Sequence, residues 1–217
     1  MTGMEFIARV FPYLALGLFV LGTAVRFIRW RSLPAHLKWT LYPFPKDAAG
    51  QLKYMAGEIF TFGTLYHFNR RLWIGAYALH MAMGGFVLLF ILYLAGWVPG
   101  TAVRLMLVIL LAALVYLAAL RSMDRYLRAM TTPEEFFNLL FLASFAVAAL
   151  AASAVAASPR AYFLSLALLR PDAARLPQEF APVIVLGGLF LVYLPWSRMI
   201  HYVSKYFAYH AIKWQKS

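Results

Sequence analysis

The chain lacks cysteine altogether and has few acidic side chains, 8 Asp and Glu against 20 Lys and Arg in 217 residues. Without cysteine it can form no disulfide, no zinc–thiolate site and no iron–sulfur cluster of its own, so electron transfer would need another cofactor. Only 13% of the residues are charged and 64% are hydrophobic. Soluble enzymes, disordered chains and nucleic-acid-binding proteins are all more polar than this. The composition therefore predicts an integral membrane protein.

Five apolar segments have about the 20 residues that a helix needs to cross a bilayer. They cover residues 10–28, 73–97, 103–120, 136–157 and 182–200. Basic residues follow the first segment in a stop-transfer pattern, so we expect a retained helix and not a cleaved signal peptide. The predicted fold is all-α, a bundle of five transmembrane helices that forms one membrane domain over residues 1–217.

The basic residues alternate between the connections. Fifteen of the 20 Lys and Arg lie in residues 26–72, 121–135 and 198–217. By the positive-inside rule the N-terminus is outside and the C-terminus is cytoplasmic, in a multi-pass protein of the cytoplasmic membrane. This sidedness accounts for the basic excess, so no nucleic-acid partner is expected.

The first connection, residues 32–72, is the longest and is predicted to be cytoplasmic. It opens with a Pro-rich stretch that favours extended backbone. From residue 50 to residue 65 apolar side chains recur at helical spacing, which predicts a helix lying along the membrane interface. A loop of this length is often functional, and a simple spacer is the alternative.

Histidines are the groups with the clearest chemical use. His36, His67 and His210 fall in loops or at the cytoplasmic edge, where an ordinary surface role is expected. His80 lies nine residues after Arg71, about 13 Å along the second helix from the basic ring, and His201 ends the fifth span on the same side. Two histidines on separate helices are what a b-type haem requires.

Small residues surround His80 in the sequence. Gly84 and Gly85 follow it, and Gly75 and Ala76 precede it, so a flat macrocycle could approach the backbone closely. The alternative is structural. A buried histidine can bond the carbonyl of a neighbouring helix, and glycines also serve plain helix packing.

The segment Tyr193-Leu-Pro-Trp-Ser-Arg-Met-Ile-His201-Tyr-Val-Ser204 resembles the last-helix motif of the gamma subunit of respiratory nitrate reductase, a five-helix cytochrome b. Residues 11–26 are similar to the first helix of that family, and residues 77–80 to the segment that ends in its first haem ligand. The long first loop looks closer to the branch whose cytochrome b subunits partner heterodisulfide-reductase-like iron–sulfur proteins, as in sulfite-reductase-associated complexes.

The resemblance implies haem and quinone chemistry, with His80 and His201 as axial ligands of the haem near the cytoplasm. The second haem of the family would need histidines where this chain has Phe90 and Val183. One haem b is therefore expected, with quinone as substrate and with a cytoplasmic iron–sulfur subunit, heterodisulfide-reductase-like or nitrate-reductase-beta-like, as partner.

With one haem the quinone site should lie beside it on the cytoplasmic side. Five residues are candidates for contacts with the haem propionates or the quinone, although each could equally be an interfacial anchor: Arg71, Trp73, Tyr77, Tyr202 and Lys205. Three basic stretches, at residues 26–31, 70–71 and 121–128, would form the docking face for the partner. The chain supplies no complete substrate chemistry of its own.

Other functional classes are less well supported. A transporter would need buried carboxylates, and no Asp or Glu lies inside the five predicted spans. An intramembrane protease would need a catalytic pair, whereas Ser144 and Ser153 have no histidine at matching depth and should bond the backbone one turn back. The second hypothesis is a non-redox membrane anchor of a respiratory complex.

Overall fold

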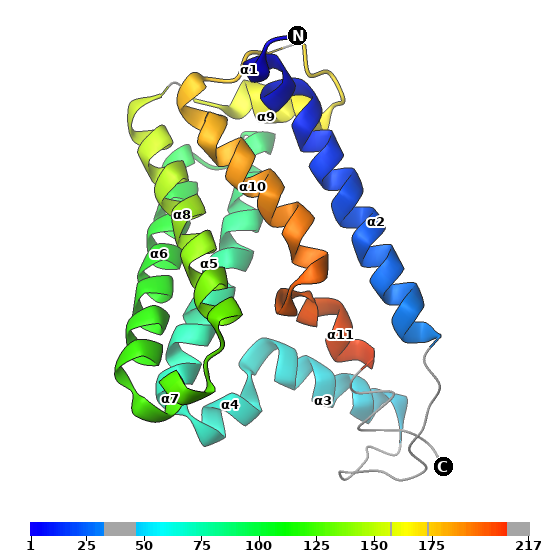
Figure 1. The fold of residues 1–217 in the computed structure, drawn as a ribbon, viewed down its shortest axis with the longest axis vertical. Coiled ribbons are helices and arrows are strands. Elements are labelled where there is room, and N and C mark those ends of the chain that lie inside the picture. The colour runs from blue at the N-terminus through cyan, green and yellow to red at the C-terminus, as the bar shows by residue number, and fades with distance from the viewer. Residues whose placement is uncertain (33–46, 157, 173, 208–217) are drawn as a thin grey trace. The chain divides into compact units, whose positions relative to one another are not determined.

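The computed structural model describes residues 1–32, 47–156, 158–172 and 174–207, and all regular structure within these ranges is helical (Figure 1). Five helices are long and apolar enough to cross a membrane, and they confirm the five predicted spans. They are Gly3–Arg31, Arg70–Ala95, Gly100–Met123, Pro133–Val155 and Gln178–Trp196. The chain is thus all-α and multi-pass, while its sidedness stays a prediction from the charge pattern.

The contacts divide the chain into two compact units. The first unit comprises residues 1–12 and 62–187, and the second comprises residues 13–61 and 188–217. Each unit is described by itself.

Three long helices form the body of the first unit, α5 (Arg70–Ala95), α6 (Gly100–Met123) and α8 (Pro133–Val155), with α6 packed against both of the others (Figure 1). Buried leucines recur along α6 at helical spacing, as at Leu107, Leu110 and Leu114. The facing side of α8 is built from alanines, among them Ala146, which is fully buried. Small side chains allow close approach of helices where lipid offers no hydrophobic drive to associate.

Local signals in the sequence explain where these helices begin and end. The Asn69 side chain accepts a hydrogen bond from the Leu72 N–H (3.0 Å) at the start of α5. Thr132 and Glu135 form a capping box at the start of α8. Gly96 ends α5 with a φ of 86°, a left-handed conformation that glycine adopts without steric cost.

Short helices complete the first unit. These are α1 (Gly3–Glu5), the π-turn η1 (Phe6–Val10), α4 (Gly63–Phe68), α7 (Arg125–Met130), α9 (Arg160–Ala167), η2 (Gln178–Phe180) and the first part of α10 (Ala181–Tyr193). Arg160 joins α9 to α5, because its guanidinium donates to the carbonyls of Tyr93 and Leu94, each at 3.0 Å. Tyr162 joins α9 to the N-terminal turns by donating to the Ala8 carbonyl at 2.8 Å.

The second unit contains most of α2 (Phe11–Arg31), α3 (Ala48–Thr61), the end of α10, two 3-10 turns and α11 (His201–Phe207). The 3-10 turns are η3 (Leu194–Trp196) and η4 (Arg198–Ile200). The Lys205 ammonium donates to the Glu58 carbonyl (3.3 Å), and the Phe207 ring packs edge-on against Phe27 at 5.2 Å. These contacts join α11 to α3 and to α2.

The fifth span begins and ends four residues earlier than the sequence predicts, and His201 does not end it. The span stops at Trp196, Ser197 is extended with a ψ of 170°, and His201 begins α11. Pro195 lacks an N–H group, which removes a helical hydrogen bond and favours a break. The Ser197 hydroxyl then accepts a hydrogen bond from the Met199 N–H (3.1 Å) and starts the next turn.

The helix predicted over residues 50–65 is also interrupted. Helix α3 covers Ala48–Thr61, and α4 begins at Gly63. Between them Phe62 has a left-handed backbone, with φ 49° and ψ 44°. The apolar periodicity runs across this position, so it does not reveal the break.

Candidate functional site

His80 lies in the middle of α5 with its side chain half-buried. Its Nδ1 atom is 2.7 Å from the carbonyl oxygen of Ala76, one turn earlier on the same helix. A carbonyl only accepts, so Nδ1 donates the hydrogen bond, and in the neutral imidazole Nε2 then carries the lone pair. Histidines that bind a metal through Nε2 are commonly oriented by such a backbone bond at Nδ1.

Aromatic rings form a continuous series from α4 to His80. The ring of Phe62 lies 4.9 Å from the imidazole of His80 and 6.1 Å from the ring of Tyr77. Tyr77 stacks on Trp73 at 5.0 Å, and Trp73 meets Tyr66 edge-on at 5.0 Å. The structure thus brings three predicted site residues, Trp73, Tyr77 and His80, into one cluster. Phe62 was not among the site residues predicted from the sequence.

The small residues near His80 do not share one role. An added Cβ at Gly84, one turn after His80, would meet nothing within 4 Å. An added Cβ at Gly75 would lie 2.6 Å from a side-chain atom of Leu117, and one at Gly85 would lie 2.8 Å from the sulfur of Met106. Gly75 and Gly85 therefore serve the packing of α5 against α6, and only Gly84 leaves the open space that the sequence analysis expected of the whole group.

His201 belongs to the second unit, where its side chain is exposed at the first position of α11. The backbone before it is built from the Pro-Trp-Ser-Arg motif. The Ser197 hydroxyl donates to the Leu194 carbonyl at 3.0 Å and also caps the following turn. The motif therefore sets the residue at which α11 starts, so that His201 is the first residue of that helix.

In the second unit, Arg26 of α2 contacts the residues at the helix break, Pro195 and Trp196. Its Nε donates to the Pro195 carbonyl at 3.2 Å, and its guanidinium lies over the Trp196 ring, 5.4 Å from the centroid. Gly22, one turn earlier, lies so close that an added Cβ would be 3.0 Å from the Pro195 Cβ. This contact was not predicted, because Arg26 was counted among the basic residues of the docking face. The Pro in an otherwise apolar span was the signal that a carbonyl there would need a donor.

The remaining candidate contacts have separate surroundings. Arg71 is exposed in the first turn of α5, where its carbonyl accepts a hydrogen bond from the Tyr116 hydroxyl at 3.1 Å. Lys205 is half-buried on α11, and its bond to the Glu58 carbonyl gives it a structural role in the second unit. Tyr202 is the second residue of α11, and its side chain lies outside what the structure describes.

Among the other histidines, His67 is exposed on α4, with its ring edge-on to Tyr66 at 5.6 Å. His36 and His210 lie outside the described residues. Phe90 and Val183 stand where the resembled family has the histidines of its second haem, and both side chains are packed in apolar surroundings. The Phe90 ring meets Phe163 edge-on at 5.1 Å, and Val183 is 7% exposed.

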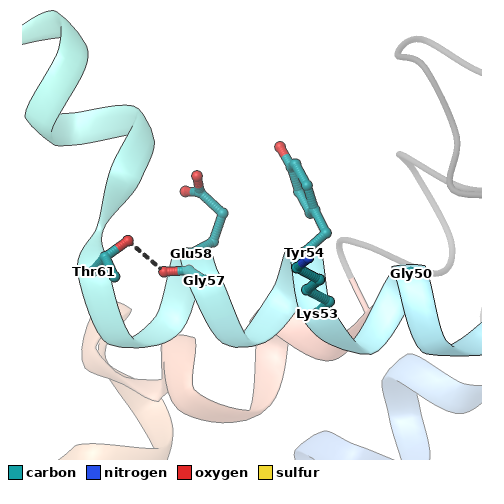
Figure 2. A pocket seen from close by; sticks show the side chains of 6 residues that line it. All are labelled: Gly50, Lys53, Tyr54, Gly57, Glu58 and Thr61. Carbon is teal, nitrogen blue, oxygen red and sulfur yellow. Dashed lines mark hydrogen bonds between the residues drawn. The ribbon is translucent and has the colours of Figure 1, made fainter.

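A shallow hollow of about 410 Å³ lies over one side of α3 (Figure 2). The side chains of Tyr54 and Glu58 project from the same side of the helix, and the Thr61 hydroxyl bonds the Gly57 carbonyl at 2.7 Å. Gly50 and Gly57 contribute only backbone to its lining, and Lys53 and Tyr54 lie between them. None of the predicted site residues lines this hollow.

Catalytic groups of other kinds do not assemble in the described part of the chain. Ser144 donates to the carbonyl of Leu140 and Ser153 to that of Leu150, each at 2.9 Å, so both serines bond the backbone one turn back as predicted. No group of three or more His, Asp or Glu side chains that could hold a metal ion occurs among the described residues.

Comparison with protein-family models gave no match, and a search of curated proteins found no relative. The likeness to the nitrate reductase gamma subunits therefore rests on the motifs quoted above.

Proposed function

We propose that the protein is a membrane cytochrome b subunit that transfers electrons between the quinone pool and a cytoplasmic iron–sulfur partner through one haem b. His80 and His201 are the axial ligands of the iron. The haem supplies one-electron transfer, and the chain binds it, orients it and shields it from lipid and water.

The observation that carries the proposal is the state of His80. Its Nδ1 proton is committed to the Ala76 carbonyl, so Nε2 is the basic nitrogen that an iron ligand needs. The ring lies within an aromatic cluster with Phe62 and Tyr77, and the backbone at Gly84 is open one turn away. A half-buried imidazole beside flat aromatic surfaces and a bare stretch of helix suits a planar macrocycle.

The number of haems follows from the two positions without histidine. Phe90 and Val183 cannot bind iron, and both are engaged in apolar packing. About 15 Å of helix separates Phe90 from His80, so no small shift in register brings a histidine to that depth. These facts support one haem near the cytoplasmic side, and quinone then exchanges electrons and protons beside it.

The resemblance to the gamma subunits implies an iron–sulfur protein as the partner, and the chain itself has no cysteine with which to hold a cluster. The first unit offers exposed arginines for docking, Arg70 and Arg71 at the start of α5 and Arg125 and Arg128 on α7. Arginine forms strong paired hydrogen bonds with carboxylates, which suits an acidic protein surface.

The first test is the amount of haem b per polypeptide, measured as a pyridine haemochrome on the purified protein or complex. We expect a value near one in the wild type and loss of the haem from His80→Ala, because the iron then lacks an axial ligand. His67→Ala is the matched control, since that histidine is exposed in the same unit. Undiminished haem in His80→Ala would refute the ligand assignment, and a wild type without haem would favour the non-redox anchor.

A further inference from the structure

We propose that Phe62 is a positioning residue for the His80 imidazole, setting the plane in which Nε2 is presented to the haem iron. This inference rests on the proposed function, because it concerns how His80 meets the iron. It adds a residue for which the sequence analysis assigned no role.

Phe62 adds a ring contact to the hydrogen bond at the His80 imidazole. The bond from Nδ1 to the Ala76 carbonyl holds one atom of the imidazole. The Phe62 ring lies against the imidazole, with ring centroids 4.9 Å apart and an interplanar angle of 56°, so it bears on the plane that the imidazole takes.

The Phe62 ring is itself braced. It also meets Tyr77 at 6.1 Å with an interplanar angle of 84°, and Tyr77 stacks on Trp73 at 5.0 Å. Tyr77 and His80 are three residues apart on α5, so they are neighbours on one helix face. Phe62 therefore contacts the ligand and a second ring on the same helix at once, which restricts its own movement.

The backbone at Phe62 indicates that the ring is required there. Only two non-glycine residues among those described have a positive φ, Phe62 and Leu169. Leu169 follows the C-cap of α9, where a left-handed residue is common, and its side chain is 76% exposed. Phe62 is half-buried against other rings, although Gly63, which would adopt the left-handed conformation at no steric cost, is the next residue. Unfavourable backbone conformations that the surroundings maintain are found preferentially at functional sites.

The test uses three variants of Phe62 and one control, all in the full-length protein with its haem. Phe62→Leu keeps an apolar side chain without the flat ring, Phe62→Gly removes the side chain and suits the backbone, and Phe62→Tyr keeps the ring. Phe68→Leu is the control, because Phe68 lies on α4 and is 86% exposed. The measurements are haem content, haem affinity and the electron paramagnetic resonance spectrum of the oxidised haem, whose g values depend on the orientation of the axial imidazoles.

We expect Phe62→Leu and Phe62→Gly to shift the g values and to weaken haem affinity by about two- to tenfold, the usual contribution of one aromatic contact. Phe62→Tyr and Phe68→Leu should resemble the wild type. Wild-type spectra and affinity in both Phe62→Leu and Phe62→Gly would overturn the positioning role and leave the cytochrome intact. Absence of haem from the wild type would instead overturn the proposed function.

Discussion

Replacing Arg26 by methionine should destabilise the second unit, because the Pro195 carbonyl then loses its donor. Pro195 is one of the most completely buried side chains of the described residues. The lost interactions are a hydrogen bond from a charged donor at 3.2 Å and a cation–π contact with Trp196 at 5.4 Å. A charged hydrogen bond contributes roughly 1.5–3 kcal/mol and a partly exposed cation–π contact roughly 0.5–1 kcal/mol.

Since Arg26 is only half-buried, we expect a loss of about 2–3 kcal/mol in the free energy of unfolding. For a chain of this size that loss lowers the unfolding temperature by about 5–10 °C. The assay is thermal unfolding of the purified protein in one detergent, followed by circular dichroism. Arg29→Met is the matched control, because Arg29 is exposed three residues further along α2. Equal unfolding temperatures for Arg26→Met and the wild type would refute the reasoning about the helix break.

Three further predictions concern α5 and the contacts that hold it. Gly75→Ala should cost about 1–3 kcal/mol of stability, because the new methyl group would lie 2.6 Å from a side-chain atom of Leu117. Gly84→Leu should leave the unfolding temperature unchanged and lower the haem content, because the leucine would crowd the face next to His80. Thermal unfolding and the haemochrome assay check both variants, and a normal haem content in Gly84→Leu would contradict the assignment of that face. Arg160→Met should cost about 1–2 kcal/mol, because it removes the hydrogen bonds to the last carbonyls of α5, and an unchanged unfolding temperature would show that water satisfies those carbonyls equally well.

The five spans could be predicted because run length and hydropathy alone determine whether a helix can cross a bilayer. The interruptions were harder to predict. Pro195 signals a break, yet Met199 and Ile200 are apolar again after Ser197 and Arg198, so a count of apolar residues runs across it. At Phe62 no local signal exists, because a phenylalanine takes the left-handed conformation beside a glycine that would accept it more readily.

The candidate site could be predicted only in part, for a related reason. The sequence shows that small residues lie near His80, but it does not show what approaches them. At Gly75 and Gly85 the neighbours are side chains of α6, and at Gly84 the space is open. Whether a glycine is packed or open depends on which face of its helix meets a neighbouring helix. An apolar helix has few polar residues in its sequence to show which face that is.

Helix α5 therefore has two faces with separate tasks. At about 100° of rotation per residue, Trp73, Tyr77, His80 and Gly84 fall within about 60° of one another, on the side opposite Gly75. The face of α5 that bears Gly75 packs against α6 and holds the two helices together. Any membrane protein with this fold would need that face. The His80 side carries the ring contacts with Phe62 and, at Gly84, open space. A plain anchor would require only the first face, whereas a cytochrome would require both. Substitutions on the His80 face that reduce haem content without lowering stability would therefore distinguish the two functions.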